Sequence, residues 1–236
     1  MIKVLAITPP ILGCISIGKI VEKNGERIPE NNDEFTITSQ TQSKNGWVKH
    51  PMDEALRVKA GHNKLRNISV RMIFDDPEQN LRVEYTLFDR QTGRPICIGN
   101  GETCQRLGSQ GIEEHPCASP SLCSLSQGGL CKTYARLYVN LDEVNGRGTF
   151  IFRTTDFYSI RTLAARLAYY HAVSEGLLSC MSLQLTLRAK NSTNKYLTPL
   201  YYADLILRDG VLLHDAIVIA KEINERNKQV GLSRKF

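Results

Sequence analysis

The sequence predicts an α+β fold with a mainly antiparallel sheet, two helices in its C-terminal half and an inserted four-cysteine zinc knuckle. Three observations lead to this expectation. Segments that alternate apolar and polar residues dominate the first half of the chain. Two segments with helical periodicity lie in the second half. Between them, residues 99–133 hold four of the seven cysteines in a run rich in Gly, Ser and Pro that lacks periodicity.

The first half is expected to be mostly strands, because its alternating segments are rich in Ile, Val, Thr and Phe. Residues 67–74 and 81–88 are predicted to pair as a hairpin, since Asp, Pro and Asn between them favour a turn. A short helix is predicted over 51–60, where Pro51 suits the first helical position and acidic residues follow it. Further strands are expected at 34–42 and 95–98.

The second half is predicted to contain two strand pairs and two helices. The pairs are 134–141 with 149–153, and 181–190 with 195–207. The clearest helix covers 156–175, between Asp156 as the N-cap and a stop at Gly176, and a last helix covers 212–228. Apolar spacing in the first helix predicts a buried stripe formed by Ile160, Leu163, Ala164, Leu167, Ala168 and His171.

We expect one compact domain with an insertion. Residues 1–98 form the β-rich N-terminal part of its core, 99–133 the metal-knuckle insertion, and 134–236 the basic α+β C-terminal part. The N-terminal residues lack the pattern of a signal peptide, and no apolar run has the length of a membrane span. We therefore expect a cytoplasmic protein without a membrane partner, whose cysteines stay reduced.

A long loop is expected over residues 99–129, and such a loop needs something other than an apolar core to order it. Four thiolates satisfy the tetrahedral coordination of zinc, and metal binding would supply that order. An iron–sulfur cluster is the second choice, and free thiols in a flexible segment are the plain alternative. His115 or Cys97 could replace one thiolate, although Cys97 in its strand-like context fits a small buried hydrophobe better. The predicted ligands are Cys104, Cys117, Cys123 and Cys131.

The net charge of +6 lies entirely in the second half of the chain. Residues 1–118 carry fifteen basic and fifteen acidic side chains, whereas 119–236 carry fifteen and nine. This excess makes DNA a candidate partner. Its phosphates could bind at the start of the helix near residues 153–161. Its bases could stack on the tyrosines of the strands that also carry Lys and Arg. A capped helix and core aromatic residues are the plainer interpretations. The candidate contact residues are Arg153, Arg161, Arg166, Arg188, Lys190, Lys195 and Tyr201.

Several segments resemble one family of phage and integrative-element proteins. They are ITPPILGCISIGKIVEKNG, EYTLFDRQTGRPICIGNGETC, CASPSLCSLSQGGLCKTYARL, FIFRTTDFYSIRTLAARLAYY and LTPLYYADL. The family is typified by recombination directionality factors of large serine integrases, and its members are often labelled hydrolase or metal-binding protein. The resemblance implies a non-enzymatic accessory protein in a bacterial host cell, which binds a serine integrase and redirects it from integration to excision.

Two other functions stay open from the residues alone. The first is a zinc-containing protein of replication or repair that binds single-stranded DNA. The second is a metal-dependent hydrolase, which a closed four-cysteine site disfavours because catalytic zinc keeps an open coordination position. No P-loop, GxSxG or HExxH motif is present, so no catalytic residue is predicted.

Overall fold

The computed structural model describes residues 10–23, 26–43, 46–61, 64–89, 92–126, 129–142, 148–191 and 199–230. Its helices are α1 (Pro51–Ala60), α2 (Pro77–Asn80), α3 (Phe157–Val173) and α4 (Leu213–Gln229), with short 3-10 turns η1 (Ser124–Ser126) and η3 (Leu178–Cys180). Its strands are β1 (Ile11–Lys23), β2 (Glu26–Ser43), β3 (Gly46–Lys49), β4 (Asn67–Met72), β5 (Leu81–Phe88), β6 (Pro95–Gly99), β7 (Thr103–Gly108), β8 (Gly111–Pro116), β9 (Cys131–Leu141), β10 (Thr149–Thr154), β11 (Leu183–Lys190) and β12 (Leu200–Leu207).

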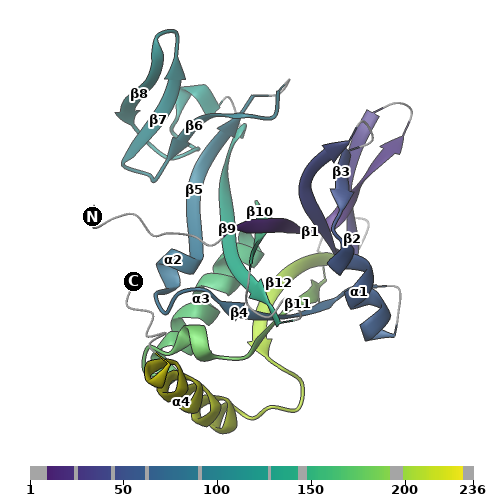
Figure 1. Ribbon diagram of the computed structural model, residues 1–236. Coiled ribbons are helices and arrows are strands. Elements are labelled where there is room, and N and C mark those ends of the chain that lie inside the picture. Colours follow the sequence, from purple (N-terminus) through teal and green to yellow (C-terminus); the bar gives the residue numbers. More distant parts are fainter. Residues whose placement is uncertain are drawn as a thin grey trace.

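The strands join in one twelve-stranded sheet, most of whose pairs are antiparallel (Figure 1). Its main path runs β3-β2-β1-β10-β9-β5-β6-β7-β8, and β4 links β9 to the β11–β12 pair. Strands β1 and β10 pair in parallel. The predicted α+β class, the antiparallel sheet and the two C-terminal-half helices are confirmed. The zinc knuckle stays a prediction.

The predicted hairpin between residues 67–74 and 81–88 is wrong. Strands β4 and β5 both pair with β9, where Val70 lies opposite Leu141 and Leu81 lies opposite Leu137. The two strands therefore follow one another along one edge of β9, like a single long strand with an excursion between them. The turn residues predicted at 75–80 form this excursion, which contains α2 and does not reverse the chain.

The expectation of a loop over residues 99–129 is also wrong for residues 103–116. Strands β7 and β8 form a hairpin that extends the sheet beyond β6, at the upper left of Figure 1. Most side chains of this hairpin are exposed or half-buried, because it lies at the end of the sheet. A strand that buries neither face needs no alternation of apolar and polar residues, which is the pattern that identifies strands in a sequence.

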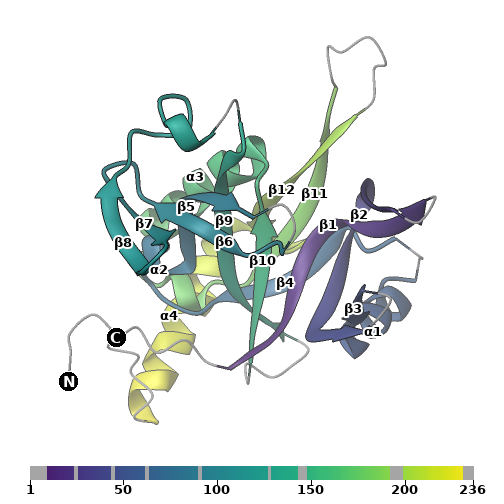
Figure 2. The same ribbon diagram turned by 90° about the horizontal axis from the view of Figure 1, so that it is seen from above.

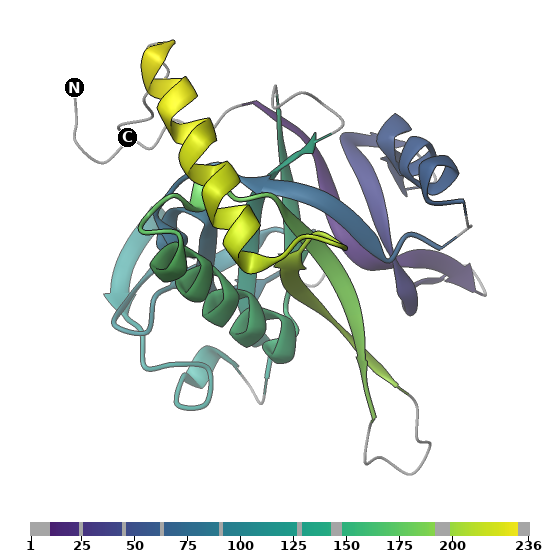
Figure 3. The ribbon, with the colours of Figure 1, turned by 90° about the horizontal axis from the view of Figure 1, so that it is seen from below.

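Helices α1, α3 and α4 confirm the three predicted helices. In α3, Asp156 caps the N-terminus by accepting a hydrogen bond from the Ser159 backbone N–H at 2.6 Å. The predicted stripe is partly wrong, because Ala164 and Ala168 are exposed while Tyr170 is buried. Helices α3 and α4 lie on the same side of the molecule in Figure 3, and none of the described helices is long and apolar enough to cross a membrane.

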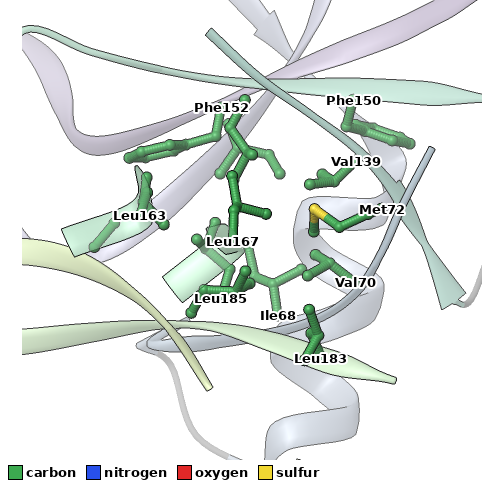
Figure 4. Packing of buried hydrophobic residues seen from close by; sticks show 14 of the residues in the cluster. Ile68, Val70, Met72, Val139, Phe150, Phe152, Leu163, Leu167, Leu183 and Leu185 are labelled. Atoms are coloured by element: carbon green, nitrogen blue, oxygen red, sulfur yellow. The ribbon is translucent and has the colours of Figure 1, made fainter. Parts of the chain in front are cut away.

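The main apolar core lies where β4, β9, β10 and β11 meet α3 (Figure 4). Phe150 and Phe152 from β10 and Leu163 and Leu167 from α3 are fully buried there. These side chains hold α3 against the sheet, and the β11–β12 hairpin extends past it away from the body of the molecule (Figure 2). The core thereby positions the N-terminal end of α3, whereas the cysteine-bearing strands β6 and β7 are held by pairing at the end of the sheet.

Candidate functional site

The five cysteines between residues 97 and 131 are brought together by the end of the sheet. Strand order β9-β5-β6-β7-β8 places Cys131 on β9, Cys97 on β6 and Cys104 on β7. The chain then leaves β8 at Pro116 and returns to β9 through residues 117–130, which carry Cys117 and Cys123. The segment that carries Cys117 and Cys123 therefore begins after β8, which pairs with the Cys104 strand β7, and ends at β9, which carries Cys131.

The strand register puts the three strand cysteines on one face of the sheet. Cys97 lies opposite Arg106 on β7 and opposite Leu87 on β5, and Leu87 lies opposite Cys131. Residues directly opposite one another point to the same side, and so do residues two apart along a strand. Cys104, two residues before Arg106, therefore shares the face of Cys97 and Cys131.

Gly99 marks the point where the loop crosses this face. A Cβ atom on Gly99 would lie 2.7 Å from the Cys117 sulfur and 2.8 Å from the Cys104 Cβ. A side chain at this position would collide with both cysteines. The Cys117 backbone N–H donates to the Glu102 carbonyl at 2.8 Å, which fixes the start of the loop beside the β6–β7 turn.

The five sulfurs lie within electrostatic reach of one another. Burial raises the pKa of Cys104, and a hydrogen bond with Cys97 raises it further. Burial likewise raises the pKa of Cys131 to about 11, with contributions from the other four thiols, Cys123 first. These shifts favour protonated thiols unless a cation is close to them.

Arg106 is the positive charge beside this cluster. Its Nε is buried and has no hydrogen-bond partner of ordinary geometry among the described residues. Interaction with the Cys97 sulfur is the first cause that raises the pKa of Arg106, and the charges of Cys104 and Cys123 also contribute. The guanidinium group thus faces the thiols and lowers the pKa of Cys104, although burial and Cys97 outweigh it and leave that pKa raised.

The thiols are gathered, but they are not arranged around one point. Nowhere in the described part of the chain do three or more His, Cys, Asp or Glu side chains stand close enough to hold a metal ion together. His115, on β8 opposite Cys104, lies 3.1 Å from a Glu113 carboxylate oxygen. The donor chemistry suits zinc, whereas ligation would require the loop to draw closer to the sheet. The four predicted ligands therefore stay a prediction.

The predicted basic contact residues do not form one surface. Asp204, buried on β12, accepts hydrogen bonds from the Nε atoms of Arg166 at 3.0 Å and Arg188 at 2.6 Å. These two arginines are therefore held by a carboxylate of the protein. Tyr201 is half-buried opposite Ala189, on the other face of the hairpin from Arg188 and Lys190.

The other predicted contacts are dispersed. Arg161 is exposed on α3, and Arg153 is exposed on β10, where it lies opposite Arg136 of β9. Lys195 lies outside the described residues. The predicted phosphate site at the start of α3 is already used by the Asp156 carboxylate, which accepts from Ser159. The capped-helix interpretation therefore describes this helix start better.

Two exposed aromatic residues, Phe157 and Tyr158, were not among the contacts predicted from the sequence, although the neighbouring Lys190 was. Phe157 and Tyr158 are 63% and 40% exposed at the first turn of α3, and their rings contact each other at 6.2 Å between centroids. The Lys190 ammonium lies 4.1 Å from the centre of the Tyr158 ring, and Leu200 is opposite Lys190 on β12. Two bulky aromatic residues outside the buried stripe of the helix were the signal in the sequence.

Comparison with known proteins places the chain in a family. The Gp3-like family, described as recombination directionality factor-like, matches residues 12–208, which include the cysteine segment, α3 and all twelve strands except the first residue of β1. No curated protein and no solved structure shows significant similarity to the chain. Because the match covers most of the 236 residues, the chain belongs to the Gp3-like family of recombination directionality factor-like proteins.

Proposed function

We propose that this chain binds a serine integrase of its mobile element and shifts it from integration to excision, in the cytoplasm of a bacterial host cell. The family match over residues 12–208 carries this proposal. A factor that sets the direction of recombination must bind one conformation of the recombinase more tightly than another, because only differential binding shifts an equilibrium. Such a role needs no turnover, so we propose a non-enzymatic protein.

The contact surface that we propose for the integrase is the α3 surface, formed by Phe157, Tyr158, Arg161, Lys190 and Leu200. Its exposed members combine two aromatic rings, one aliphatic side chain and two cations. Centres of protein interfaces are enriched in aromatic residues and arginine, and a few such anchors supply most of the binding energy. This composition supports a protein partner.

Binding of single-stranded DNA is the second candidate function. Stacked bases need exposed aromatic rings beside cations, and Tyr158 with Lys190 offers one such pair. Arg166 and Arg188 weaken this alternative, since both already contact the Asp204 carboxylate. We therefore place DNA after the recombinase as the direct partner.

The test is a recombination reaction with the integrase of the same element, together with a direct binding measurement without DNA. We expect the protein to promote excision, inhibit integration and bind the integrase alone. Replacement of both aromatic residues, Phe157→Ala with Tyr158→Ala, should weaken integrase binding by about 30-fold, the effect of losing about 2 kcal/mol at an interface anchor.

Ile112→Ala is the matched control, because Ile112 is a comparably exposed apolar side chain on the distant β8 strand. If the double variant still supports excision and the Ile112→Ala control does not, the integrase contact lies on the β7–β8 hairpin and not on the α3 surface. Absence of both integrase binding and any effect on recombination direction would overturn the proposed function itself.

A further inference from the structure

We propose that one zinc ion binds Cys97 and Cys104 from β6 and β7 together with Cys117 and Cys123 from the following loop, and that Cys131 lies outside its coordination shell. Three of the four ligands predicted from the sequence are kept, and Cys97 replaces Cys131. This inference concerns the end of the sheet formed by β6, β7 and β8. It stands whether or not the protein binds an integrase.

The order of the strands distinguishes the two sets of ligands. Zinc–sulfur bonds of about 2.3 Å in a tetrahedron place the four sulfurs roughly 4 Å apart. Cys104 and Cys131 lie on β7 and β9, with β5 and β6 between them. Three strand spacings amount to roughly 14 Å across a flat sheet, and curvature of the sheet shortens this distance only in part. The predicted set therefore combines thiols from β7 and β9, two strands that are not neighbours, and Cys104 contributes least among the four thiols that raise the pKa of Cys131.

Cys97 removes this difficulty because it is on the strand next to Cys104. In the register, Gly99 pairs with Cys104 and Cys97 pairs with Arg106, so the two cysteines are diagonal neighbours on one face. Diagonal neighbours have Cα atoms roughly 7–8 Å apart and Cβ atoms that are closer, a separation that long side chains can bridge. Two strand thiols can therefore serve as the fixed half of the site.

Cys117 is already above this half of the site. Its sulfur and the Cys104 Cβ approach the same point above Gly99, at 2.7 and 2.8 Å. Glycine at position 99 leaves the space that the Cys117 sulfur occupies. A third sulfur is thus adjacent to the strand pair without any rearrangement of the sheet.

Cys123 supplies the fourth sulfur from the same loop, and it acts electrostatically on Arg106 together with Cys97 and Cys104. Among the described residues between 117 and 130, regular structure is limited to the single turn η1, and no strand pairing restrains Cys123. Binding free energy of a structural zinc can order a short segment of this kind. Zinc bound in this way would join the loop to the face that carries Cys97 and Cys104.

Arg106 fits the charge of the proposed site. Four thiolates around Zn²⁺ carry a net charge of −2, which a neighbouring guanidinium group offsets. The buried Arg106 Nε has no ordinary hydrogen-bond partner among the described residues, and its strand position is opposite Cys97. A metal-bound Cys97 sulfur would accept this N–H, as outer-shell groups do for metal ligands.

The first experiment measures metal binding by the full chain and its variants. We expect one zinc ion per chain, and after cobalt substitution the absorption of tetrahedral Co²⁺ with four thiolates. Cys97→Ser should weaken binding by more than the roughly 10–100-fold that loss of an outer-shell group costs, and should reduce sulfur-to-cobalt charge transfer. Cys131→Ser and the distant Cys14→Ser should leave the spectrum unchanged, whereas Arg106→Gln should weaken binding without changing the spectrum.

The second experiment uses the unmodified chain and so does not depend on how the variants fold. A thiol-alkylating reagent is added with and without a zinc chelator, and the modified cysteines are identified by peptide mass spectrometry. Cys97 should react only after chelation. A Cys97 that reacts equally in both samples, a cobalt spectrum lost in Cys131→Ser but kept in Cys97→Ser, iron with sulfide in the purified protein, or no bound metal would each overturn the proposal.

Discussion

His50 connects the start of α1 to the apolar core. Its imidazole Nδ1 accepts a hydrogen bond from the Met52 backbone N–H at 3.2 Å, and its ring packs edge-on against Phe150, with centroids 5.1 Å apart. Nδ1 can accept this bond only while it carries no proton. Burial lowers the pKa of His50, so the folded protein favours the neutral imidazole.

This arrangement predicts a loss of stability in mild acid. The folded-state pKa of His50 lies below the ordinary value of 6.5, so the unfolded chain takes up the proton first as the pH falls. The stabilisation is fully present above about pH 6.5 and disappears as the pH falls through the folded pKa. We expect the thermal midpoint to fall more in the wild type than in His50→Asn, whose amide caps the helix without titrating. Equal falls in both proteins would assign the pH dependence to other groups.

Asp204 is the buried carboxylate on which Arg166 and Arg188 converge. Its side chain is 2% exposed, whereas the two arginines are 43% and 49% exposed. Asp204→Ala should therefore lower the free energy of unfolding by about 2–3 kcal/mol, less than the 3–5 expected when both partners of an ion pair are buried. Arg188→Gln, which removes one half-exposed partner, should cost less than about 1 kcal/mol.

Chemical denaturation measures both variants. Equal and small losses would show that the pair of arginines contributes little to folding. The same geometry shows why charge reversal at Arg188 is a poor probe of DNA binding. A carboxylate introduced there would face Asp204 and destabilise the hairpin, so weaker DNA binding would have two causes.

At the scale of elements, helices α1, α3 and α4 and the strand pairs β9–β10 and β11–β12 were predicted correctly, whereas β1, β3, β7, β8 and the partner of β4 and β5 were not. Local signals mark α1, α3 and α4, because Pro51, the Asp156 cap and apolar spacing act within a few residues. Pairing between strands depends on residues far apart in the chain. The sequence of β4 and β5 therefore predicted two strands correctly and their partner wrongly, since their pairing with β9, much later in the chain, leaves no local signal.

The candidate site shows the same limit. The sequence predicted a strand around Cys97 and placed Cys104 in a loop, so nothing suggested that the two thiols share a face of one hairpin. Asp204, Phe157 and Tyr158 were missed for a related reason. An acid or an aromatic residue in an otherwise ordinary strand or helix acquires its role from what the fold places opposite it.

Asn80 holds the excursion between β4 and β5. Its fully buried side-chain oxygen accepts from the backbone N–H groups of Ile73 and Phe74, both at 3.0 Å. Its amide nitrogen donates to the carbonyls of Phe74 and Asp76, at 2.7 and 2.9 Å. This one side chain therefore satisfies four backbone groups of a segment that has left the sheet.

Replacement of Asn80 should consequently destabilise the folded protein. Asn80→Ala leaves these groups without their partner, and we expect the free energy of unfolding to fall by about 3 kcal/mol. Glu78→Ala, an exposed change on the same turn, should stay within about 0.5 kcal/mol. A comparable loss in both variants, measured by denaturant unfolding, would show that helix formation in α2 holds the excursion instead of the Asn80 amide.

For the whole molecule, the distribution of charge decides what the basic excess can do. The net charge is +6 over 236 residues, and part of the positive charge in the second half is held by internal carboxylates. Arg166 and Arg188 contact Asp204, and Arg208 contacts Asp142. Tight non-specific binding to DNA requires many phosphate contacts, since each one contributes only through the counterions that it releases. These ion pairs reduce the number of cations that are available to phosphate, which is why we place DNA after the recombinase as the direct partner.

The last prediction separates a protein partner from DNA. Affinity for an oligonucleotide is measured from about 50 to about 200 mM salt for the wild type and for the double variant Arg161→Glu with Lys190→Glu. Both side chains are exposed cations of the α3 surface, and neither makes an ion pair with a carboxylate among the described residues. We expect weak DNA binding with a shallow salt dependence in both proteins, because protein contact is the main role of this surface. Integrase binding, measured on the same samples without DNA, should fall in the variant. A steep salt dependence in the wild type, lost in the variant while integrase binding stays intact, would instead show that the α3 surface contacts phosphate directly and would make DNA the primary partner.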